Sequence, residues 1–551
     1  MKSKLYIPLF SMSALVAAFV SCTDLDVDIK SQYTDFPTTE RAAEAISADV
    51  YAAYRGALGY NHWMVQTLSS DEAVSVALGT DYYDGGRFRE LHVHNWTSDN
   101  AILPNMWNAA MTGINLSNNV LTIFGDDESD KAAPMRAMRA YFYFLLMDNF
   151  GGAPLIKGKV DQIPDRSSRA EIANFIESEL LAVRDRLPGE VSAATYGKAT
   201  RYMADALLAK LYLNWSVYTS GDVAAYTPAM PNEKLAQVVA MCDDIIQSGQ
   251  FNLSSHKYLE KFRPDNGPQI KDFIFAMPYD REKQQGMTYA RFWIHRSGQN
   301  QFAPLPSSVG GTFRVLPTFL AKFNLEGDDR NASYMGGLQY YWSDYSPDLS
   351  RPFLIRTSKK GIDQDYSGSD ENVTFDWHME TTKEITLRPD GGPTLNAGND
   401  QKGRSMGYRS VKFYMDVNVT AANNRNQSND VPIFRYADVL LMKAEAILRG
   451  AAPTNGETAM SLMNQVRAYV NAPALTTEPT FAELLDERAR EFSDESWRRN
   501  DLIRYGKFEE DWGFKSLYAA GSSERYRRIF PVPRQVLEVN KHWTQNTGYP
   551  Q

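Results

Sequence analysis

Residues 136–155 read RAMRAYFYFLLMDNFGGAPL, and they lie in the part of the chain that decides its fold. They belong to a region from about Thr39 to Gly249 that we predict to be a succession of helices. Ser168-Arg-Ala-Glu171 has the pattern of a capping box, which satisfies the first free backbone amides of a helix. Gly249 follows the apolar periodicity that begins at Leu235, at a position where a left-handed residue commonly ends a helix.

The middle of the chain, from about Phe251 to Asn429, differs in composition. It is rich in Gly, Pro, Asn, Asp and Tyr, and short alternating pieces such as Lys412–Val419 are typical of long loops with small β-hairpins. Helical patterns return at residues 435–448, 459–470 and 480–492, the last with a capping box at Thr480-Phe-Ala-Glu483. We therefore predict a mainly α fold in a single body, 39–551, with a helical scaffold at 39–250 and 430–551 and a loop-rich ligand-binding lobe at 251–429.

Two segments of the scaffold echo one another. Arg201–Lys210, RYMADALLAK, and Arg435–Lys443, RYADVLLMK, match once a single residue is skipped. Both place Ala where small side chains let a neighbouring helix approach closely, as stacked helix pairs of the tetratricopeptide type require. The strict tetratricopeptide pattern is absent, so the echo predicts a scaffold that is only repeat-like.

Composition narrows the classes of function. The 551 residues carry a net charge of -9, and no basic stripe with interleaved aromatics occurs. A nucleic-acid partner is therefore not expected, because phosphate binding needs a basic face. Thirty Tyr and ten Trp are more rings than a core needs, which leaves some for a surface site.

The first residues have the pattern of a targeting segment. Lys2 and Lys4 precede the apolar run Leu5–Val20, and Ser21-Cys22 follows, so we predict a lipoprotein signal peptide at 1–21. Cys22 is the predicted lipidation site, with a flexible tether at 22–38; the acidic residues after Cys22 resemble a surface-export signal of bacterial lipoproteins. The alternatives are an ordinary cleaved signal peptide and, less favoured because the run is short, a retained membrane anchor.

Patterns typical of enzymes and metal sites are absent or incomplete. The sequence holds no Gly-x-Ser-x-Gly elbow, phosphate-binding loop or His-Glu-x-x-His motif. His92 and His94 lack a matching third ligand, and the loop that begins at Asp363 has Thr374 where a calcium loop needs Glu. Cys242 lies on the apolar face of a predicted helix, as a small core residue would. We therefore predict no catalytic residues, no metal and no cofactor.

Four segments come in a fixed order along the chain: Arg136–Leu155, Ile433–Ala446, Leu484–Gly506 and Phe530–Tyr549. Together they resemble the signature blocks of the SusD/RagB family of outer-membrane lipoproteins, and they follow a lipoprotein signal. Arg488 and Glu491, like Glu487 and Arg490, stand three apart on one helix, which suits mutual pairing on the helix surface or pairing against a neighbouring element.

The resemblance implies both an architecture and partners. The architecture is a helical body of four tetratricopeptide-like units packed against an irregular ligand-binding lobe. The implied partner is a SusC-like TonB-dependent transporter in the outer membrane, over which the protein would close as a hinged lid from the extracellular side. Glycans are the family's commonest ligands, and some members serve peptide import.

Flat aromatic rings next to polar groups mark candidate ligand contacts, because sugars stack on rings and offer hydroxyls to polar side chains. The candidates lie in four parts of the chain, and they are Trp63, Asp71, Tyr82, Tyr83, Trp293, Tyr340, Trp342 and Arg409. Any single ring among them can equally serve packing. Starch-binding relatives carry Trp soon after the Asp71-Glu72 pair, whereas this chain has Ala73–Leu78, which counts against starch.

These patterns leave four alternative hypotheses for the function of the protein. The leading hypothesis is a glycan-binding import lipoprotein, and the second is the same architecture importing peptides. A glycoside hydrolase is the third, without positive support beyond the carboxylate pairs of any acidic chain. A scaffold without a ligand is the fourth.

Overall fold

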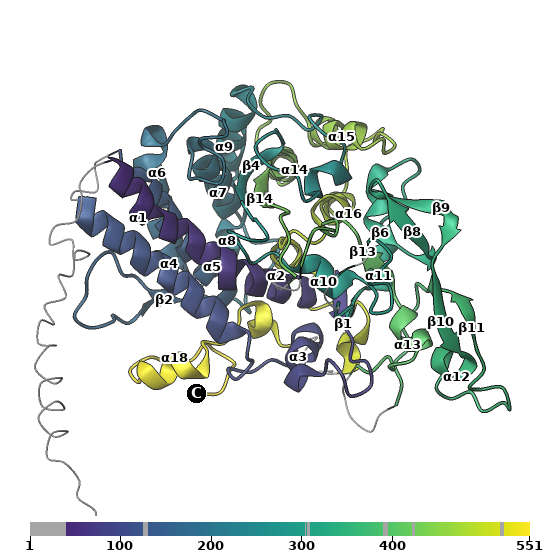
Figure 1. Ribbon diagram of the computed structural model, residues 1–551. Helices are drawn as coiled ribbons and strands as arrows, with labels where there is room; N and C mark the ends of the chain where they lie inside the picture. Colours follow the sequence, from purple (N-terminus) through teal and green to yellow (C-terminus); the bar gives the residue numbers. More distant parts are fainter. Residues whose placement is uncertain are drawn as a thin grey trace, which may run out of the picture.

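The computed structural model describes residues 40–124, 130–303, 305, 309–389, 395–420, 425–517 and 523–551. Within these residues, helices gather on one side of the molecule and short strands with long loops on the other (Figure 1). The predicted signal segment, Cys22 and the tether at 22–38 lie outside the described residues. No helix in the described part is both long and apolar enough to cross a membrane.

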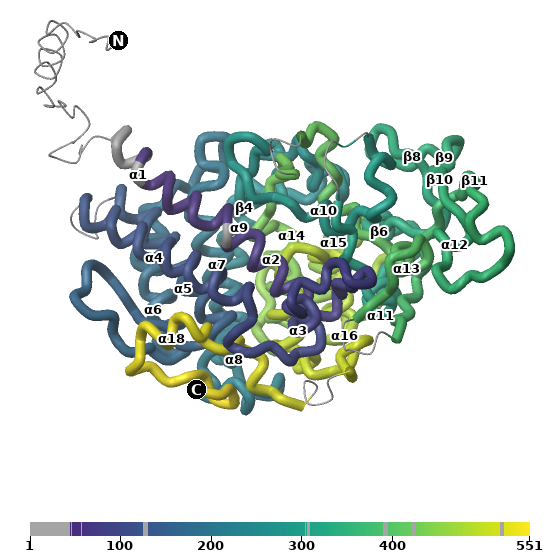
Figure 2. The backbone as a smooth tube through the Cα atoms, turned by 60° about the horizontal axis from the view of Figure 1, so that its bottom comes forward, coloured from purple at the N-terminus to yellow at the C-terminus, as the bar shows by residue number. Residues whose placement is uncertain are grey.

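The helices of the N-terminal half lie side by side (Figures 1 and 2). They are α1 (Glu40–Ala53), the π-helical turn η1 (Tyr54–Leu58), α2 (Gly59–Leu68), η2 (Asp84–Gly86), α3 (Arg87–Val93), α4 (Leu103–Phe124), α5 (Ala133–Phe150), α6 (Arg169–Val183), η3 (Arg184–Arg186), α7 (Arg201–Leu213), α8 (Trp215–Thr219) and α9 (Leu235–Gln247). Helix α4 packs on α5, α5 on α6, and α7 on α9. Neighbouring helices therefore pair as a tetratricopeptide-like scaffold requires.

Helix α5 carries most of the stretch 136–155 and is the central helix of this half. Every residue from Ala137 to Phe150 is buried, because a helix that is apolar on nearly all sides has to be enclosed by other elements. Its one buried cation there, Arg139, pairs with Glu179 of α6 at 2.5 Å. The helix ends at Gly151, whose φ of +77° favours glycine.

The C-terminal helices complete the scaffold. They are α14 (Tyr436–Leu448), α15 (Ala459–Tyr469), α16 (Phe481–Phe492), α17 (Arg498–Arg504), η6 (Phe514–Leu517), η8 (Arg525–Arg528) and α18 (Arg534–Val539). The capping boxes predicted at Ser168 and Thr480 are both confirmed. The echoed segments form α7 and α14, which contact each other, and Lys210 of α7 pairs with Asp438 of α14 at 2.6 Å.

The lobe consists of loops and two-stranded antiparallel pairs. Its larger strands are β4 (Phe273–Met277), which pairs with β14 (Val431–Arg435), β8 (Tyr340–Ser343) with β9 (Ser346–Pro352), and β10 (Leu354–Ser358) with β11 (Thr374–His378). Its short strands are β5 (Phe313–Val315), β6 (Tyr334–Met335), β7 (Gly337–Leu338), β12 (Glu380–Thr381) and β13 (Arg409–Ser410). In the N-terminal half, β2 (Ala153–Pro154) pairs with β3 (Arg166–Ser167), and β1 (Ala73–Ser75) pairs with β5 of the lobe. Short helices are η4 (Leu259–Phe262), α10 (Tyr289–Trp293), α11 (Pro317–Leu320), η5 (Asp329–Ser333), α12 (Lys359–Ile362) and α13 (Gln401–Ser405). The predicted mainly α fold with small hairpins is confirmed.

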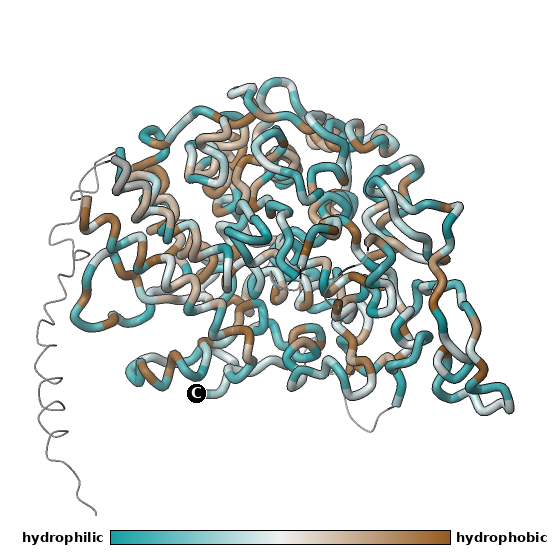
Figure 3. Tube along the Cα trace, viewed as in Figure 1, coloured by the Kyte–Doolittle hydropathy of each residue, from teal (hydrophilic) through white to brown (hydrophobic). Residues whose placement is uncertain are grey.

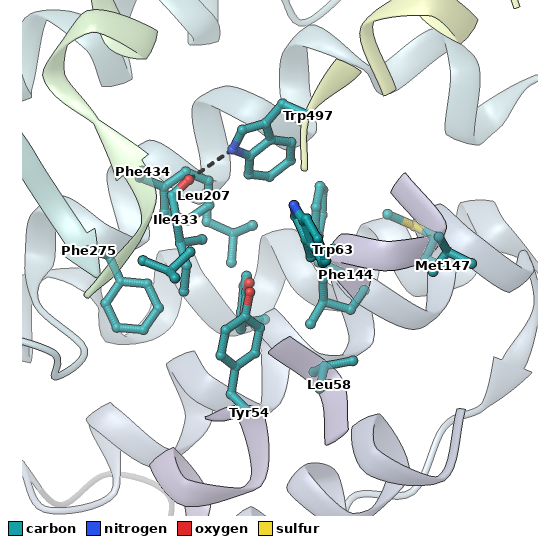
Figure 4. Close-up of a cluster of buried hydrophobic side chains, with 14 of the residues drawn as sticks. Tyr54, Leu58, Trp63, Phe144, Met147, Leu207, Phe275, Ile433, Phe434 and Trp497 are labelled. Carbon is teal, nitrogen blue, oxygen red and sulfur yellow. Dashed lines mark hydrogen bonds between the residues drawn. The ribbon is translucent and has the colours of Figure 1, made fainter. Parts of the chain in front are cut away.

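A single aromatic core joins the scaffold to the lobe. Figure 4 shows Trp63 of α2, Phe144 of α5 and Phe434 of β14 in one cluster with Trp497. Trp497 stacks on Phe434 with ring centroids 5.7 Å apart, and its Nε1 donates to the carbonyl of Ile433 at 3.0 Å. Hydrophilic and hydrophobic residues are interspersed along the helices (Figure 3), and the buried apolar residues of α4, α5 and α7 lie in this core.

A buried ion network ties α16 to the lobe. Arg435 pairs with Asp272 at 2.7 Å, with Glu491 at 2.8 Å and with Glu495 at 2.8 Å. Arg330 of the lobe likewise pairs with Asp328, Glu487 and Glu491, all of them fully buried. Buried charges persist only when they are paired in this way, so these residues serve the fold.

Both kinds of pairing expected for α16, along the helix and against neighbouring elements, are present. Glu487 and Arg490 pair at 2.8 Å as predicted. Arg488 instead reaches Asp438 and Asp501, both at 2.8 Å. Asp438 lies on α14 and Asp501 on α17, so Arg488 pairs with neighbouring helices, while Glu491 is held by Arg330 and Arg435.

Candidate functional site

Four of the candidate ligand residues are buried, which corrects the expectation that they meet a ligand. Trp63 is 0% exposed, stacks on Tyr289 with ring centroids 4.0 Å apart, and donates from Nε1 to Asp494 at 2.7 Å. Figure 4 shows its ring inside the core. Trp293 is 2% exposed and packs edge-on against Phe313. Both rings are core residues because long-range packing encloses them.

The two polar members of this group serve the fold as well. Arg409 is fully buried and donates to the backbone carbonyls of Arg404, Met406 and Gly407. Both carboxylate oxygens of Asp71 accept from Arg498, at 2.6 and 2.7 Å. These contacts hold both side chains within the fold, and Asp71 also lines a separate hollow with Lys322, Arg498 and Trp512.

The other four candidates reach the surface, in two separate places. Trp342 and Tyr340 lie on β8, while Tyr82 and Tyr83 lie in the loop that precedes α3. Tyr340 meets His378 edge-on, with ring centroids 5.5 Å apart, and does not line a hollow with Trp342. Trp342 is therefore the candidate on β8 that the structure places in a pocket.

We call this hollow of about 380 Å³ the Trp342 pocket. It is lined by Pro264, Asp265, Arg281, Phe302, Trp342, Ser343, Asp344, Tyr345, Tyr414, Met415, Asp416, Val417 and Asn418. The Trp342 ring lies 5.4 Å from Phe302 and 5.7 Å from Tyr414, and Tyr345 meets Tyr414 at 4.8 Å. The pocket thus has an aromatic wall assembled from three segments of the lobe.

Polar groups edge this wall. Arg281 pairs with Asp416 at 3.2 Å, and Arg281 remains about one-third exposed. The guanidinium of Arg263 lies 4.1 Å from the centroid of the Tyr345 ring, as in a cation–π contact. The Nε1 of Trp342 is buried and has no partner among the described residues. The pocket therefore combines ring faces with groups that can exchange hydrogen bonds with hydroxyls.

A strained turn holds Tyr345 outward. Ser343 of β8 pairs with Ser346 of β9, so Asp344 and Tyr345 form a two-residue hairpin loop. Both have positive φ, 47° and 63°, as a type I′ turn requires. Glycine and asparagine are the usual residues there, and each other residue costs about 1 kcal/mol or more. Tyr345 is nonetheless 39% exposed at the pocket, and strain of this kind often accompanies a functional residue.

Asp430, directly before β14, is bonded to both the lobe and the scaffold. Its carboxylate accepts from the backbone N–H of Tyr279 and from the hydroxyl of Tyr196, both at 2.7 Å. Burial raises the pKa of Asp430 to about 7, although these two hydrogen bonds lower it. The Asp430 carboxyl group therefore loses its proton and becomes negatively charged near neutral pH.

This shift predicts how stability depends on pH. Between about pH 4 and pH 7 the unfolded chain has lost the Asp430 proton while the folded chain still binds it, so raising the pH lowers the free energy of unfolding. The Asp430→Asn variant should lack this component. Urea unfolding of both proteins at several pH values should show wild type losing stability relative to the variant as pH rises, levelling off above about pH 7. Parallel curves would contradict the shift.

The second exposed place surrounds Tyr82. The Arg296 guanidinium lies 5.0 Å from the centroid of the Tyr82 ring and pairs with Asp81 at 3.1 Å. Tyr82 has a positive φ of 62°, and the neighbouring Tyr83 is 41% exposed. These rings lie on an open surface and not in a hollow with Trp342.

The described residues hold no group of three or more His, Cys, Asp or Glu side chains that would bind a metal ion. His92 and His94 are fully buried, and burial lowers the pKa of both, that of His92 to about 4. Burial raises the pKa of the Cys242 thiol well above its ordinary value. The carboxylate of Asp363, at the start of the incomplete calcium-loop pattern, forms an ion pair with Lys402 at 3.1 Å.

Sequence reasoning did not find Phe302, Tyr345 or Tyr414. Tyr414 lies in the alternating piece 412–419, and Tyr345 lies three residues after Trp342. For Tyr345, its position three residues after the candidate Trp342 was a usable signal in the sequence. The three segments come together only through the fold, so the pocket itself was not predictable.

The fold and the pocket place the protein among helical-repeat scaffolds that carry an irregular lobe with an open hollow. The chain belongs to the SusD family, because the profile of that family matches residues 271–549, half of its length. A second profile, described as starch-binding and associating with the outer membrane, matches residues 25–213. The family resemblance seen in the four signature segments is thus confirmed.

Known relatives agree with this assignment. The chain is 25% identical over 440 residues to the starch-binding protein SusD of Bacteroides thetaiotaomicron, covering 76% of this chain and 72% of that protein. It is 24% identical over 534 residues to a SusD-like protein of Bacteroides ovatus, covering 93% and 84%. These relatives are described as starch-binding and as SusD-like, respectively.

Solved structures share the fold. A laminarin binding SusD-like protein matches with a TM-score of 0.65 at 20% identity, covering 93% of this chain and 100% of that one. The surface glycan-binding protein A from Bacteroides thetaiotaomicron, in complex with laminarihexaose, matches with a TM-score of 0.64 at 18% identity, covering 92% and 99%. At these identities the likeness establishes the fold alone.

Proposed function

We propose that this protein captures glycans at the cell surface without cleaving them, and delivers them as a hinged lid to a SusC-like TonB-dependent transporter. The Trp342 pocket is the observation that carries the proposal. Relatives described as binding starch and laminarin support the ligand class. The transporter as partner rests on membership of the SusD family.

The chemistry of the pocket suits a sugar. The apolar face of a pyranose ring packs against an aromatic face, and Trp342, Tyr345 and Tyr414 offer such faces with little conformational entropy to lose. Arg281, which pairs with the buried Asp416 and remains about one-third exposed, is placed to bond the hydroxyls at the edge of the ring. A volume of about 380 Å³ is within the range of small-ligand pockets and holds part of a longer chain.

Affinity electrophoresis tests the ligand class. The chain from residue 23 onward is run through gels that contain starch, laminarin and a panel of plant and algal polysaccharides. Retardation by at least one glycan, with no reducing ends released on incubation, is the expected result. Release of reducing ends would establish a glycoside hydrolase, and calorimetric binding of peptides with no glycan binding would establish peptide import.

The proposed location predicts the effect of substituting Cys22, which lies outside the described residues. Cys22→Ala removes the thiol that would carry the lipid, and with it the apolar attachment to the outer membrane. The variant should incorporate no labelled palmitate and should leave the membrane fraction, whereas a Cys242→Ala control stays there. Proteinase added to intact cells should degrade the wild-type protein. Retention of the Cys22→Ala variant in the membrane fraction would contradict lipid anchoring.

A further inference from the structure

A second hollow, of about 590 Å³, lies in the helical scaffold, and we call it the Arg169 pocket. Its wall includes the end of α5, strand β3, the first residue of α6, the loop that follows α8, and the C-terminal residues 542–547. Helix α6 lies at the opposite end of the molecule from β8, which carries Trp342 (Figures 1 and 2). The two pockets share no residue, so the Arg169 pocket is a separate feature of the fold.

Arg169 lines this pocket without a polar partner. Its side chain is only 8% exposed, and its Nε and Nη1 are buried with no hydrogen-bond partner among the described residues. In that part of the chain its guanidinium forms no ion pair either, and it lies 5.1 Å from the centroid of the Tyr218 ring. Nη2 is not enclosed in the same way, so a ligand in the pocket can reach the guanidinium there. Because buried charges are normally paired, an anion from outside would complete this site.

The buried carboxylate beside Tyr218 does not supply the missing partner. Asp148 accepts through Oδ1 from the hydroxyl of Tyr218 at 2.8 Å and from the Nδ2 of Asn500 at 2.7 Å. It forms no ion pair with Arg169 among the described residues. The positive charge of Arg169 is therefore left to the pocket.

Two exposed carboxylates at the edge of the pocket are also engaged elsewhere. Asp165 lies 3.6 Å from the Nε2 of His542, and Asp222 accepts from the backbone N–H of Ala224 at 2.9 Å. Both acidic side chains face solvent, which screens them. They would nonetheless repel a ligand more strongly as its negative charge increases, so the pocket favours a group with a single negative charge.

Arg166 fixes the wall of the pocket. Its guanidinium donates to the backbone carbonyls of Gly152 and Thr544, both at 2.9 Å, and to the Oδ1 of Asn546 at 2.5 Å. These contacts tie the C-terminal segment to β3 and to the end of α5. All three acceptors are neutral, so this second cation of the wall keeps its charge beside Arg169. A wall held in this way is already formed before a ligand binds.

We propose that the Arg169 pocket is a second ligand site, which binds a small molecule through a carboxylate paired with Arg169. A carboxylate matches a guanidinium in charge and in planar shape, and it carries a single negative charge. The hydroxyls of Ser167 and Thr547 line the same hollow and can bond the rest of the molecule. The volume lies within the range of small-ligand sites. This site is independent of glycan capture at Trp342.

Calorimetric titration with matched pairs of small molecules tests the ligand class. Glucuronate is compared with glucose, and lactate with 1,2-propanediol, so that each pair differs in the carboxylate. At least one acid should bind at least about tenfold more tightly than its neutral counterpart. Binding of glucuronate alone identifies a sugar acid as the source of the carboxylate, and binding of lactate identifies a simple organic acid. Binding of inorganic phosphate in place of both acids would overturn the carboxylate assignment, and binding of none of these probes would overturn the site.

Substitutions locate the bound carboxylate. Arg169→Met removes the charge and keeps a side chain of similar length, so it should weaken binding of the acid by at least about tenfold. Arg534→Met removes an exposed arginine of α18 that pairs with Asp99 outside the pocket, and it should leave the Kd unchanged. Trp342→Ala should also leave the Kd of the acid unchanged, because the two pockets are separate.

Melting of the ligand-free proteins distinguishes a binding role of Arg169 from a structural one. A buried arginine without a partner does not stabilise the fold, so Arg169→Met should melt at the wild-type temperature or above it. Arg166→Met, which breaks the hydrogen bonds of the wall, should melt at a lower temperature. If Arg169→Met melts well below wild type, or binds the acid as tightly as wild type, the proposal is wrong, and glycan capture at Trp342 is unaffected.

Discussion

Trp342→Ala should weaken binding of the captured glycan by about 2 kcal/mol, roughly thirtyfold in Kd, as the loss of a central aromatic anchor does. The ring forms one wall of the pocket together with Phe302 and Tyr414, so its removal takes away a stacking face and opens the pocket to water. Calorimetric titration of wild type and variant with the same oligosaccharide measures the change.

Two further variants separate binding from folding. Tyr345→Ala removes a ring that is 39% exposed, so it should weaken binding with little change in melting temperature. Phe481→Ala removes an equally exposed ring, 43%, on α16 outside the pocket, and it should leave the Kd unchanged. Unchanged affinity in both pocket variants would show that the glycan binds elsewhere.

Arg435→Met should lower the free energy of unfolding by about 3–5 kcal/mol, because it leaves buried carboxylates without their cation. Asp272, Glu491 and Glu495 all pair with this one guanidinium and are themselves buried. The network links β14 to α16, so scaffold and lobe should unfold less cooperatively when it is lost. Urea unfolding followed by circular dichroism measures the effect.

Arg356→Met is the matched control for this loss. Arg356 pairs with Asp376 at 3.2 Å on the β10–β11 hairpin, and both side chains are more than half exposed. Solvent screens such a pair, so its removal should change stability little. An Arg435→Met protein as stable as the Arg356→Met protein would mean that the buried network contributes nothing to the fold.

The scaffold was predictable because its signals are local. Ser168 and Thr480 begin helices through hydrogen bonds to residues three positions further on. Residues 136–155 are so apolar that the helix they form is expected to be enclosed by other helices. The hairpins of the lobe follow from local composition in the same way. Family membership could be inferred because the signature segments keep their order along the chain.

The site was predictable only in part, because burial depends on distant partners. Nothing near Trp63 in the sequence reveals that Tyr289 and Asp494 enclose it. Trp342 has the same kind of local sequence and remains half-buried at a pocket.

The central claim is that a glycan binds in the Trp342 pocket, and a crystal structure with the tightest-binding oligosaccharide tests it most directly. We expect a sugar ring packed against Trp342 and Tyr345, with a hydroxyl bonded to Arg281. Sugar density at another surface, with the Trp342 pocket empty, would contradict the account.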